Sequence, residues 1–327
     1  MNESICPRRL RSFSALRGLV RETRVSPQSL VYPLFVVEEQ NVRREIPSLP
    51  GQFHYSPDRV CEAVEESLAH GVNKFLLFGL PAHKDETGSG AWDPQGVVQQ
   101  GLWAIRQRYP QVVLIGDVCL CEYTSHGHCG MLEGEVLDND KTLPLLAKTA
   151  LSQAQAGADL IAPSAMADGQ VRAIRSALDR EGFAQTGILS YSAKYASAFY
   201  GPFRDAAGSA PSFGDRKSYQ MDPHNLREAL RECALDEAEG ADCLMVKPAL
   251  SYLDVIAKVR KSTHLPLAAY SVSGEYAMIK AAARAGLIDE YPAMCEAAVS
   301  IFRAGADILI TYYARELAKA IVKGDMG

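Results

Sequence analysis

The chain has 327 residues and a mass of 35.6 kDa, which is enough for two average domains or for one large α/β barrel. Hydrophobic residues make up 47 % of the chain and charged residues 22 %, a usage that excludes collagen-like, disordered and disulfide-scaffold proteins. The formal net charge of −5 has the wrong sign for a protein that neutralises the phosphates of a duplex, so we expect no nucleic acid partner.

The amino-terminal region is basic rather than apolar. Residues 1–24 contain six arginines, interrupted by Glu3 and Glu22. Because transit peptides are poor in acidic residues, the pattern favours an ordered basic arm over residues 1–27. No stretch approaches 18 consecutive apolar residues, and the apolar segment of a secretory signal is missing. We therefore expect a cytoplasmic protein with no membrane partner.

Eight short apolar runs are predicted strands, because each is short enough to be buried on both faces of a parallel sheet. In chain order they span 30–37, 74–78, 112–118, 159–162, 187–191, 243–246, 267–270 and 308–311. Helical periodicity lies between most of them. Examples are 57–69, with Ser56 as a candidate N-cap, 169–181 and 225–239.

One turn motif closes a helix and opens a strand at three places. It reads AGAD at 156–159 and at 304–307, and EGAD at 239–242. We expect its glycine to adopt the left-handed conformation that ends a helix. Strand and helix alternate throughout, without a Gly-x-Gly-x-x-Gly phosphate loop. This favours an α/β fold of the (β/α)8 TIM barrel type over a doubly wound sheet, with one barrel domain over 28–327.

In such a barrel, functional residues follow the carboxyl ends of the strands. Chemically distinctive side chains fall at these positions. They are Asp117, Cys119, Cys121, Ser164, Lys194, Lys247, Ser271, Ser273 and Tyr312.

Three of the eight cysteines crowd into eleven residues after the third predicted strand. The segment 117–130 reads DVCLCEYTSHGHCG and adds His126 and His128 to Cys119, Cys121 and Cys129. Thiolate and imidazole ligands together select zinc among the abundant divalent metals, although a Cys-x-Cys pair alone can simply pack in a core. Three ligands would make a catalytic zinc and a fourth from either histidine a structural one, and the sequence leaves both open.

Two lysines stand at predicted strand ends among apolar or small residues. Lys247 follows LMV at 244–246, and Lys194 lies in SYSAK at 190–194. Burial and a second nearby cation both lower the pKa of a lysine, and the neutral amine can attack a carbonyl to form a Schiff base. The alternative is that both lysines bind an anionic ligand as cations.

A long segment over 199–220, rich in glycine and proline, follows Lys194. Loops of this length in compact domains are usually functional, so we expect a lid. Arg204 and Arg216 within it could hold a substrate carboxylate in bidentate fashion. Surface salt bridging would explain them equally well.

Several segments resemble the porphobilinogen synthase family, also called 5-aminolevulinate dehydratase. They are CLCEYTSHGHCG (119–130), SYSAK (190–194), FYGPFRDAA (199–207), GDRKSYQ (214–220), MVKP (245–248) and VSGEY (272–276). The resemblance covers nearly the whole chain. It implies a (β/α)8 barrel with an extended amino-terminal arm, assembled as a homo-octamer, that condenses two 5-aminolevulinates to porphobilinogen with loss of two waters.

The resemblance also assigns roles to residues. It makes Lys194 and Lys247 the imine-forming lysines and gives a catalytic zinc to Cys119, Cys121 and Cys129. The residues that it places around the substrates are Ser273 and Tyr312 for the first carboxylate, Arg204, Arg216 and Gln220 for the second, and Asp117, Ser164 and Tyr200 in the cavity wall.

Two further positions bear on metals by resemblance alone. Some zinc-using relatives carry an extra metal between the counterpart of His128 and a lid cysteine, but the matching lid residue here is Ser218, which argues against a second zinc. Glu232 matches the position where many bacterial-type relatives bind an activating magnesium at a subunit interface. On residue type alone it would be one acidic group on a solvated helix face.

Two other functions remain as alternatives. A Schiff-base aldolase on the same barrel would use one lysine and no metal. A zinc-stabilised binding protein would use both lysines to hold an anion, because a fold does not dictate a function.

Overall fold

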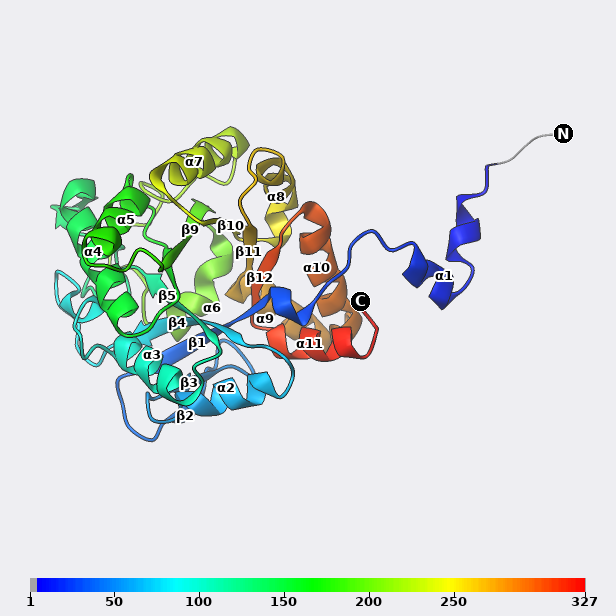
Figure 1. The fold of residues 1–327 in the computed structure, drawn as a ribbon, viewed down its shortest axis with the longest axis horizontal. Helices are drawn as coiled ribbons and strands as arrows, with labels where there is room; N and C mark the ends of the chain where they lie inside the picture. Colours follow the sequence, from blue (N-terminus) through cyan, green and yellow to red (C-terminus); the bar gives the residue numbers. More distant parts are fainter. Residues whose placement is uncertain (1–4, 327) are drawn as a thin grey trace.

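The computed structural model describes residues 5–326, and its centre is a closed parallel barrel (Figure 1). Each strand pairs with the next, and the last, β12, pairs back onto the first, β1. The eight barrel strands are β1 Leu30–Val37, β4 Lys74–Leu80, β5 Val113–Val118, β8 Leu160–Pro163, β9 Gly187–Lys194, β10 Cys243–Lys247, β11 Leu267–Ser271 and β12 Ile308–Thr311. The predicted (β/α)8 fold and all eight predicted strands are confirmed.

Helices surround the barrel on its outside (Figure 1). They are α2 Val60–Leu68, α3 Val97–Arg108, α4 Asn139–Gln155, α5 Gln170–Arg180, α7 Leu226–Glu239, α8 Leu253–Arg260, α9 Ser273–Arg284, α10 Glu290–Ala304 and α11 Ala314–Val322. Short 3-10 turns lie at η2 Pro27–Ser29, η3 Ser89–Ala91 and η5 Leu250–Tyr252. Because the strands are covered by helices outside and by side chains inside, they are apolar on both faces, which explains why apolar runs predicted them.

The three repeated turns behave as the motif predicts. Gly157, Gly240 and Gly305 have φ angles of 104°, 103° and 119°, the left-handed region in which glycine ends a helix. The motif has a second function that the sequence did not reveal. The aspartate that follows turns its carboxylate to a backbone N–H of the neighbouring strand, as Asp307 does with Leu267 at 2.8 Å.

The prediction that Ser56 caps the second helix is wrong. Its carbonyl, not its hydroxyl, accepts the N–H groups of Arg59 and Val60, both at 2.9 Å. Its hydroxyl accepts the N–H of Val42 at 2.8 Å. A turn therefore precedes α2, whose N-cap position is Arg59.

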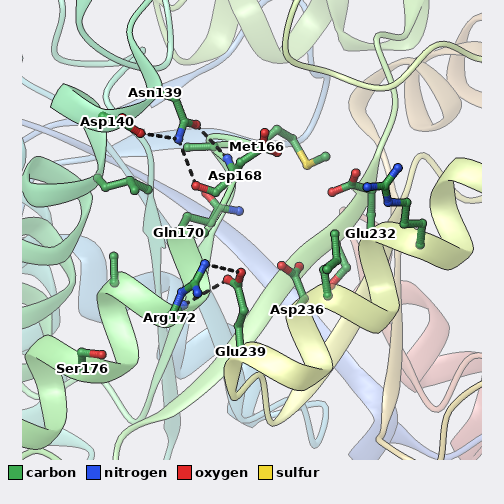
Figure 2. A pocket seen from close by; sticks show the side chains of 17 residues that line it. Asn139, Asp140, Met166, Asp168, Gln170, Arg172, Ser176, Glu232, Asp236 and Glu239 are labelled. Atoms are coloured by element: carbon green, nitrogen blue, oxygen red, sulfur yellow. Dashed lines mark hydrogen bonds and ion pairs between the residues drawn. The ribbon is translucent and has the colours of Figure 1, made fainter.

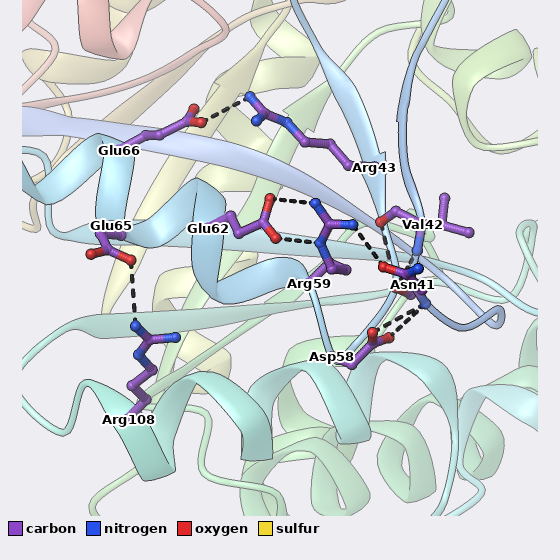
Figure 3. A network of polar contacts seen from close by, with 10 residues as sticks. Asn41, Val42, Arg43, Asp58, Arg59, Glu62, Glu65, Glu66 and Arg108 are labelled. Carbon is purple, nitrogen blue, oxygen red and sulfur yellow. Dashed lines mark hydrogen bonds and ion pairs between the residues drawn. The ribbon is translucent and has the colours of Figure 1, made fainter.

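A small hairpin of β2 Arg43–Glu45 and β3 Phe53–Tyr55 extends the sheet beside β1. Figure 3 shows the polar network that joins this region to α2 and α3. Arg43 pairs with Glu66 at 2.8 Å, and Arg108 pairs with Glu65 at 3.4 Å. Exposed pairs of this kind contribute little stability each. A second, two-residue pairing joins β6 Leu132–Glu133 to β7 Val136–Leu137.

The amino-terminal segment leads away from the barrel (Figure 1, deep blue). Its ordered elements are η1 Pro7–Arg11 and α1 Ser14–Leu19, which contact each other and bury none of their residues. Residues 1–4 of the predicted arm, including Glu3, lie outside the described residues. None of the helices over 5–326 combines the length and apolarity needed to cross a membrane.

Candidate active site

A small cavity lies at the carboxyl ends of the barrel strands. We call this end of the barrel the mouth. Its volume is about 10 Å³, room for roughly one water. The lining residues are Phe78, Asp117, Cys121, Glu122, Ser164, Lys194, Tyr200, Phe203, Arg204, Arg216 and Lys247. The cavity therefore brings both lysines and Cys121 from the predicted strand ends together with both arginines from the predicted lid.

The two lysines end neighbouring strands in matching register. Lys194 ends β9 and Lys247 ends β10, and their Cα atoms are partners across the ladder. Each residue is only 5 % exposed. The Nζ atom of Lys194 donates a hydrogen bond to the carbonyl of Ser164. The Lys247 Nζ lies 4.3 Å from the ring centre of Tyr270 and 5.0 Å from that of Tyr191.

The surroundings of Lys247 favour its neutral amine. Burial lowers the pKa of Lys247, and the charge of Lys194 lowers it further, while Asp117 and Glu122 act in the opposite direction. Loss of hydration disfavours an ammonium more than nearby rings can compensate. Lys247 therefore combines a fixed position with an amine that is easily deprotonated.

Asp117 lies across the cavity at the end of β5. The Ser164 hydroxyl donates to its Oδ2 at 2.9 Å, while its Oδ1 is buried without a partner. Burial raises the pKa of Asp117, and the charge of Glu122 raises it further. A carboxyl in this environment can hold a proton near neutral pH.

The cysteine loop, residues 119–130, brings its three thiols together. The Sγ atoms of Cys119, Cys121 and Cys129 all lie within 4.8 Å of one another, and all three residues are buried. Gly127 has a φ of 72°, and a side chain at Gly130 would collide with Thr142. The two glycines therefore let the loop fold back on itself.

Neither histidine of this loop joins the thiols. The ring nitrogens of His128 face the Tyr219 hydroxyl and the Phe213 carbonyl, both at 3.1 Å. The His126 Nε2 lies 3.2 Å from the carbonyl of Glu86. Across residues 5–326, the three cysteines are the only group of three or more His, Cys, Asp or Glu side chains placed to share one metal ion. A set of three protein ligands is typical of a catalytic zinc site, and a set of four of a structural one.

The lid, residues 199–220, is not irregular throughout. Its first part forms η4 Ala198–Tyr200 and α6 Gly201–Ala206, so the prediction of a loop is wrong there. Pro202 stands in the first turn of α6, where its fixed φ and missing N–H are tolerated. The later part rests on the cysteine loop, since Ser212 donates its N–H to the His126 carbonyl at 3.0 Å.

The predicted carboxylate-binding residues of the lid carry unused donors. Arg216 donates to the carbonyls of Gly127, at 2.8 Å, and Ser209. The Nε atoms of Arg204 and Arg216 are buried without a partner, as are both side-chain polar atoms of Gln220. Burial lowers the pKa of Arg204, and the Arg216 guanidinium lowers it further. A buried Arg216 and a half-buried Arg204, each with an unused Nε donor, are suited to an anion between them.

Three other predicted residues have structural partners. Tyr200 donates its hydroxyl to the Lys247 carbonyl at 3.3 Å. Ser273 accepts the N–H of Phe203 at 3.0 Å, and the Tyr312 hydroxyl lies 3.4 Å from that of Tyr270. Ser273, Tyr312 and Gln220 do not line the cavity as it stands.

Sequence reasoning missed Glu122. This residue is 3 % exposed, lines the cavity and accepts the Cys121 thiol at 3.2 Å. The sequence did offer a signal, because this glutamate stands in a run of otherwise buried residues. A carboxylate is seldom fully buried unless it has a partner.

Glu232 lies away from the mouth, in a surface pocket of about 790 Å³ between α5 and α7 (Figure 2). Asp236 and Asp168 share this pocket. Burial raises the pKa of Glu232 to about 7, and the charges of Asp168 and Asp236 add to the effect. In this structure the three carboxylates do not lie close enough together to share one ion.

A (β/α)8 barrel with paired buried amines and a thiol cluster at its mouth has the layout of a barrel enzyme. The model of the family "Delta-aminolevulinic acid dehydratase" matches residues 4–320. The enzyme of that name from Synechococcus elongatus is 54 % identical over 96 % of this chain and 97 % of its own, and that from Archaeoglobus fulgidus is 54 % identical over 96 % and 97 %.

A solved structure is also similar. The delta-aminolevulinic acid dehydratase of Toxoplasma gondii, in complex with the reaction product porphobilinogen, has a TM-score of 0.95 and 47 % identity, covering 98 % of this chain and 92 % of that one. The chain belongs to the delta-aminolevulinic acid dehydratase family. It is therefore an enzyme of the hydro-lyase class, as the sequence predicts.

Proposed function

We propose that this chain condenses two 5-aminolevulinates to porphobilinogen, for tetrapyrrole biosynthesis, through Schiff bases on Lys194 and Lys247. Membership of the family supports the reaction. The observation that carries the mechanism is the pair of buried lysines in register at the mouth. A binding protein would not need an amine whose surroundings favour deprotonation.

The neutral Lys247 amine attacks the ketone carbon of one substrate, and the adduct loses the ketone oxygen as water to leave an imine. Lys194 captures the second ketone in the same way. One imine nitrogen draws electrons from the adjacent carbon, which loses a proton and attacks the imine carbon of the neighbouring substrate. The lysine on that carbon leaves as an amine when a carbon–carbon double bond forms. The amino group of this second substrate then displaces the other lysine from its imine carbon, and loss of a last proton completes the pyrrole ring. Both ketone oxygens leave as water, in agreement with the two waters lost overall.

Asp117 is the residue best placed to manage protons in these steps. It faces the cavity together with both lysines, and burial raises its pKa. We assign it the transfer of a proton to the departing oxygen, with Ser164 fixing its orientation through the 2.9 Å hydrogen bond.

The lid supplies the donors for a substrate carboxylate. The unused Nε atoms of Arg204 and Arg216 and the amide of Gln220 support this assignment, since buried polar groups normally have partners. The residues assigned to the other carboxylate, Ser273 and Tyr312, rest on the family resemblance. Because the cavity has little free volume, the lid opens to admit substrate and then excludes water from the imines.

Cys119, Cys121 and Cys129 would hold Zn²⁺, because three close, buried thiols fit a soft-ligand metal. When bound, it supplies a Lewis acid beside the substrates. Glu232 would hold an activating Mg²⁺ in the outer pocket, where acidic neighbours favour a hard cation.

We also propose a homo-octamer in the cytoplasm, with the arm of each subunit wrapped around a neighbour. The arm extends from the barrel and buries none of the residues of η1 and α1 within its own chain (Figure 1). Deleting residues 1–24 should therefore reduce the assembly size measured by light scattering. An unchanged assembly would contradict this role of the arm.

One experiment tests the reaction directly. The purified protein is incubated with 5-aminolevulinate, with and without zinc, and pyrrole formation is followed by absorbance. We expect turnover with zinc, and a borohydride-stable adduct on the peptide that contains Lys247. Absence of pyrrole product with metal present would exclude the proposed reaction.

A further inference from the structure

One buried carboxylate outside the cavity joins two of the strand ends that form the mouth. Glu275, near the start of α9, is 1 % exposed and does not line the cavity. Its Oε1 accepts the N–H groups of Ala249 at 3.2 Å and Leu250 at 2.7 Å. Its Oε2 accepts the N–H of Val272 at 2.8 Å.

These three N–H groups belong to two separate segments. Ala249 and Leu250 follow Lys247 after β10, and Val272 follows β11. The ladder between β10 and β11 ends at the pair Val246 and Ala269. Beyond that pair, Glu275 bridges the two segments.

Lys247 is fixed from one side by other contacts. Its carbonyl accepts the N–H of Tyr195 at 3.0 Å and the hydroxyl of Tyr200 at 3.3 Å. Glu275 fixes the chain two and three residues further on. The backbone of Lys247 is therefore held on both sides, which keeps its amine over the Tyr270 ring.

The other oxygen of Glu275 acts on the lid. By accepting the Val272 N–H it fixes the start of α9, where Ser273 follows. Ser273 accepts the Phe203 N–H at 3.0 Å and donates to the Phe199 carbonyl at 3.3 Å. The start of α9 thus holds the first part of the lid.

A carboxylate in this position is costly to bury. Burial raises the pKa of Glu275 to about 7, although the three backbone donors lower it. A neutral amide could not replace it, because the amide has only one acceptor oxygen and its NH₂ group would face an N–H donor. Each buried N–H left without a partner costs about 1–3 kcal/mol.

We propose that Glu275 is a positioning residue, which fixes the Lys247 amine and the first part of the lid relative to each other through its two oxygens. It belongs neither to the cavity lining nor to the thiol cluster. The inference rests on the proposed function for the role of the amine, but the position of that amine can be measured without substrate.

The test compares Glu275→Gln with a control next to β10, the strand that carries Lys247. Asp242 lies just before β10, at the end of the barrel opposite the mouth, and its carboxylate accepts the Ile188 N–H at 2.7 Å. Asp242→Ala should lower the thermal unfolding midpoint without moving Lys247. For each protein, acetic anhydride labelling of the Lys247 peptide is measured against pH by mass spectrometry, without substrate.

In Glu275→Gln we expect the labelling midpoint of Lys247 to rise toward the ordinary lysine value near 10.4, because the amine leaves its buried position. We expect kcat to fall by about 10- to 100-fold, as displacement by about 1 Å can cause. Asp242→Ala should keep the parental midpoint and kcat.

If Glu275→Gln does not fold, Glu275→Asp is measured instead, because it retains two acceptor oxygens on a shorter arm. A variant that is less stable than the parent but keeps its labelling midpoint and kcat would overturn the proposal. If the parent forms no adduct with 5-aminolevulinate, the proposed imine fails, while the substrate-free labelling still decides the role of Glu275.

Discussion

The two ends of the barrel use the same kinds of side chain in different ways. At the amino ends of the strands, Asp307 accepts the N–H of Leu267 and pairs with Arg260 at 2.7 Å. Asp159 repeats this arrangement with Leu114 and Arg106.

At the mouth, charged groups keep individual polar atoms without a partner. Asp117 Oδ1 and the Nε atoms of Arg204 and Arg216 are buried and unpaired. Nearly all buried polar groups in folded proteins are hydrogen-bonded, so unpaired ones call for an explanation. The comparison teaches that paired polar side chains support the amino ends of the strands, whereas unpaired charged atoms gather at the mouth, where a polar ligand would satisfy them.

The largest effect is expected for Lys247→Arg, which tests whether the mouth is a catalytic site. Arginine keeps the positive charge but cannot be deprotonated to a nucleophile. We expect kcat/KM to fall by about 10⁴-fold or more, as for loss of a covalent nucleophile. Pyrrole formation and borohydride trapping measure the loss.

Lys247→Ala should be equally inactive and serves as the matched variant. Substantial activity with arginine would mean that the mouth binds an anion without forming an imine. Both variants should retain the parental circular dichroism spectrum.

The second prediction concerns the thiol cluster. Replacing Cys119, Cys121 and Cys129 together by Ala should abolish tight zinc binding and lower kcat by about 100-fold or more, because a transition-state charge loses its stabilisation. Zinc content by elemental analysis and turnover after chelation and zinc return are the measurements. Full activity of the triple variant would exclude a catalytic metal here.

A smaller effect is expected in the outer pocket between α5 and α7. Magnesium should raise parental activity with a coupling free energy of about 1–3 kcal/mol. Glu232→Ala should lose this response and keep the magnesium-free rate, since Glu232 is far from the cavity lining. Magnesium titrations of both proteins decide the point. An identical response would remove Glu232 from the site.

The smallest effect on catalysis is expected at the amino ends of the strands, where the charged side chains are paired. Asp307→Ala removes the acceptor of the Leu267 N–H and the partner of Arg260. It should lower the free energy of unfolding by about 1–2 kcal/mol and leave kcat unchanged. Denaturant unfolding together with steady-state kinetics tests this. A large loss of kcat at unchanged stability would contradict the division between the two ends.

Much of this division could be predicted from the sequence. Apolar runs predicted the strands, because both faces of each are buried. Lys194 and Lys247 were placed at strand ends by the same runs, and register then brought them together. The three cysteines were predicted as a group because they are close in the chain.

Other features depend on distant contacts that leave no local pattern. Glu275 binds N–H groups 25 and 26 residues away in the chain, and no spacing rule predicts that contact. The short helix α6 was missed because glycine and proline flank its start, and those residues indicate a loop when read alone. The partners of the His128 ring likewise come from the lid, so only the structure reveals that this ring faces away from the thiols.

The small volume of the cavity at the mouth affects the rate at which substrate can bind. A cavity with room for about one water cannot admit a substrate molecule while the lid keeps this arrangement. Substrate capture must pass through open molecules, so the observed association rate is the rate for open molecules multiplied by their fraction. Contacts that hold the lid, such as that between Ser212 and His126, therefore slow capture as well as sheltering the reaction. Loosening such a contact should quicken substrate entry while letting more water reach the cavity.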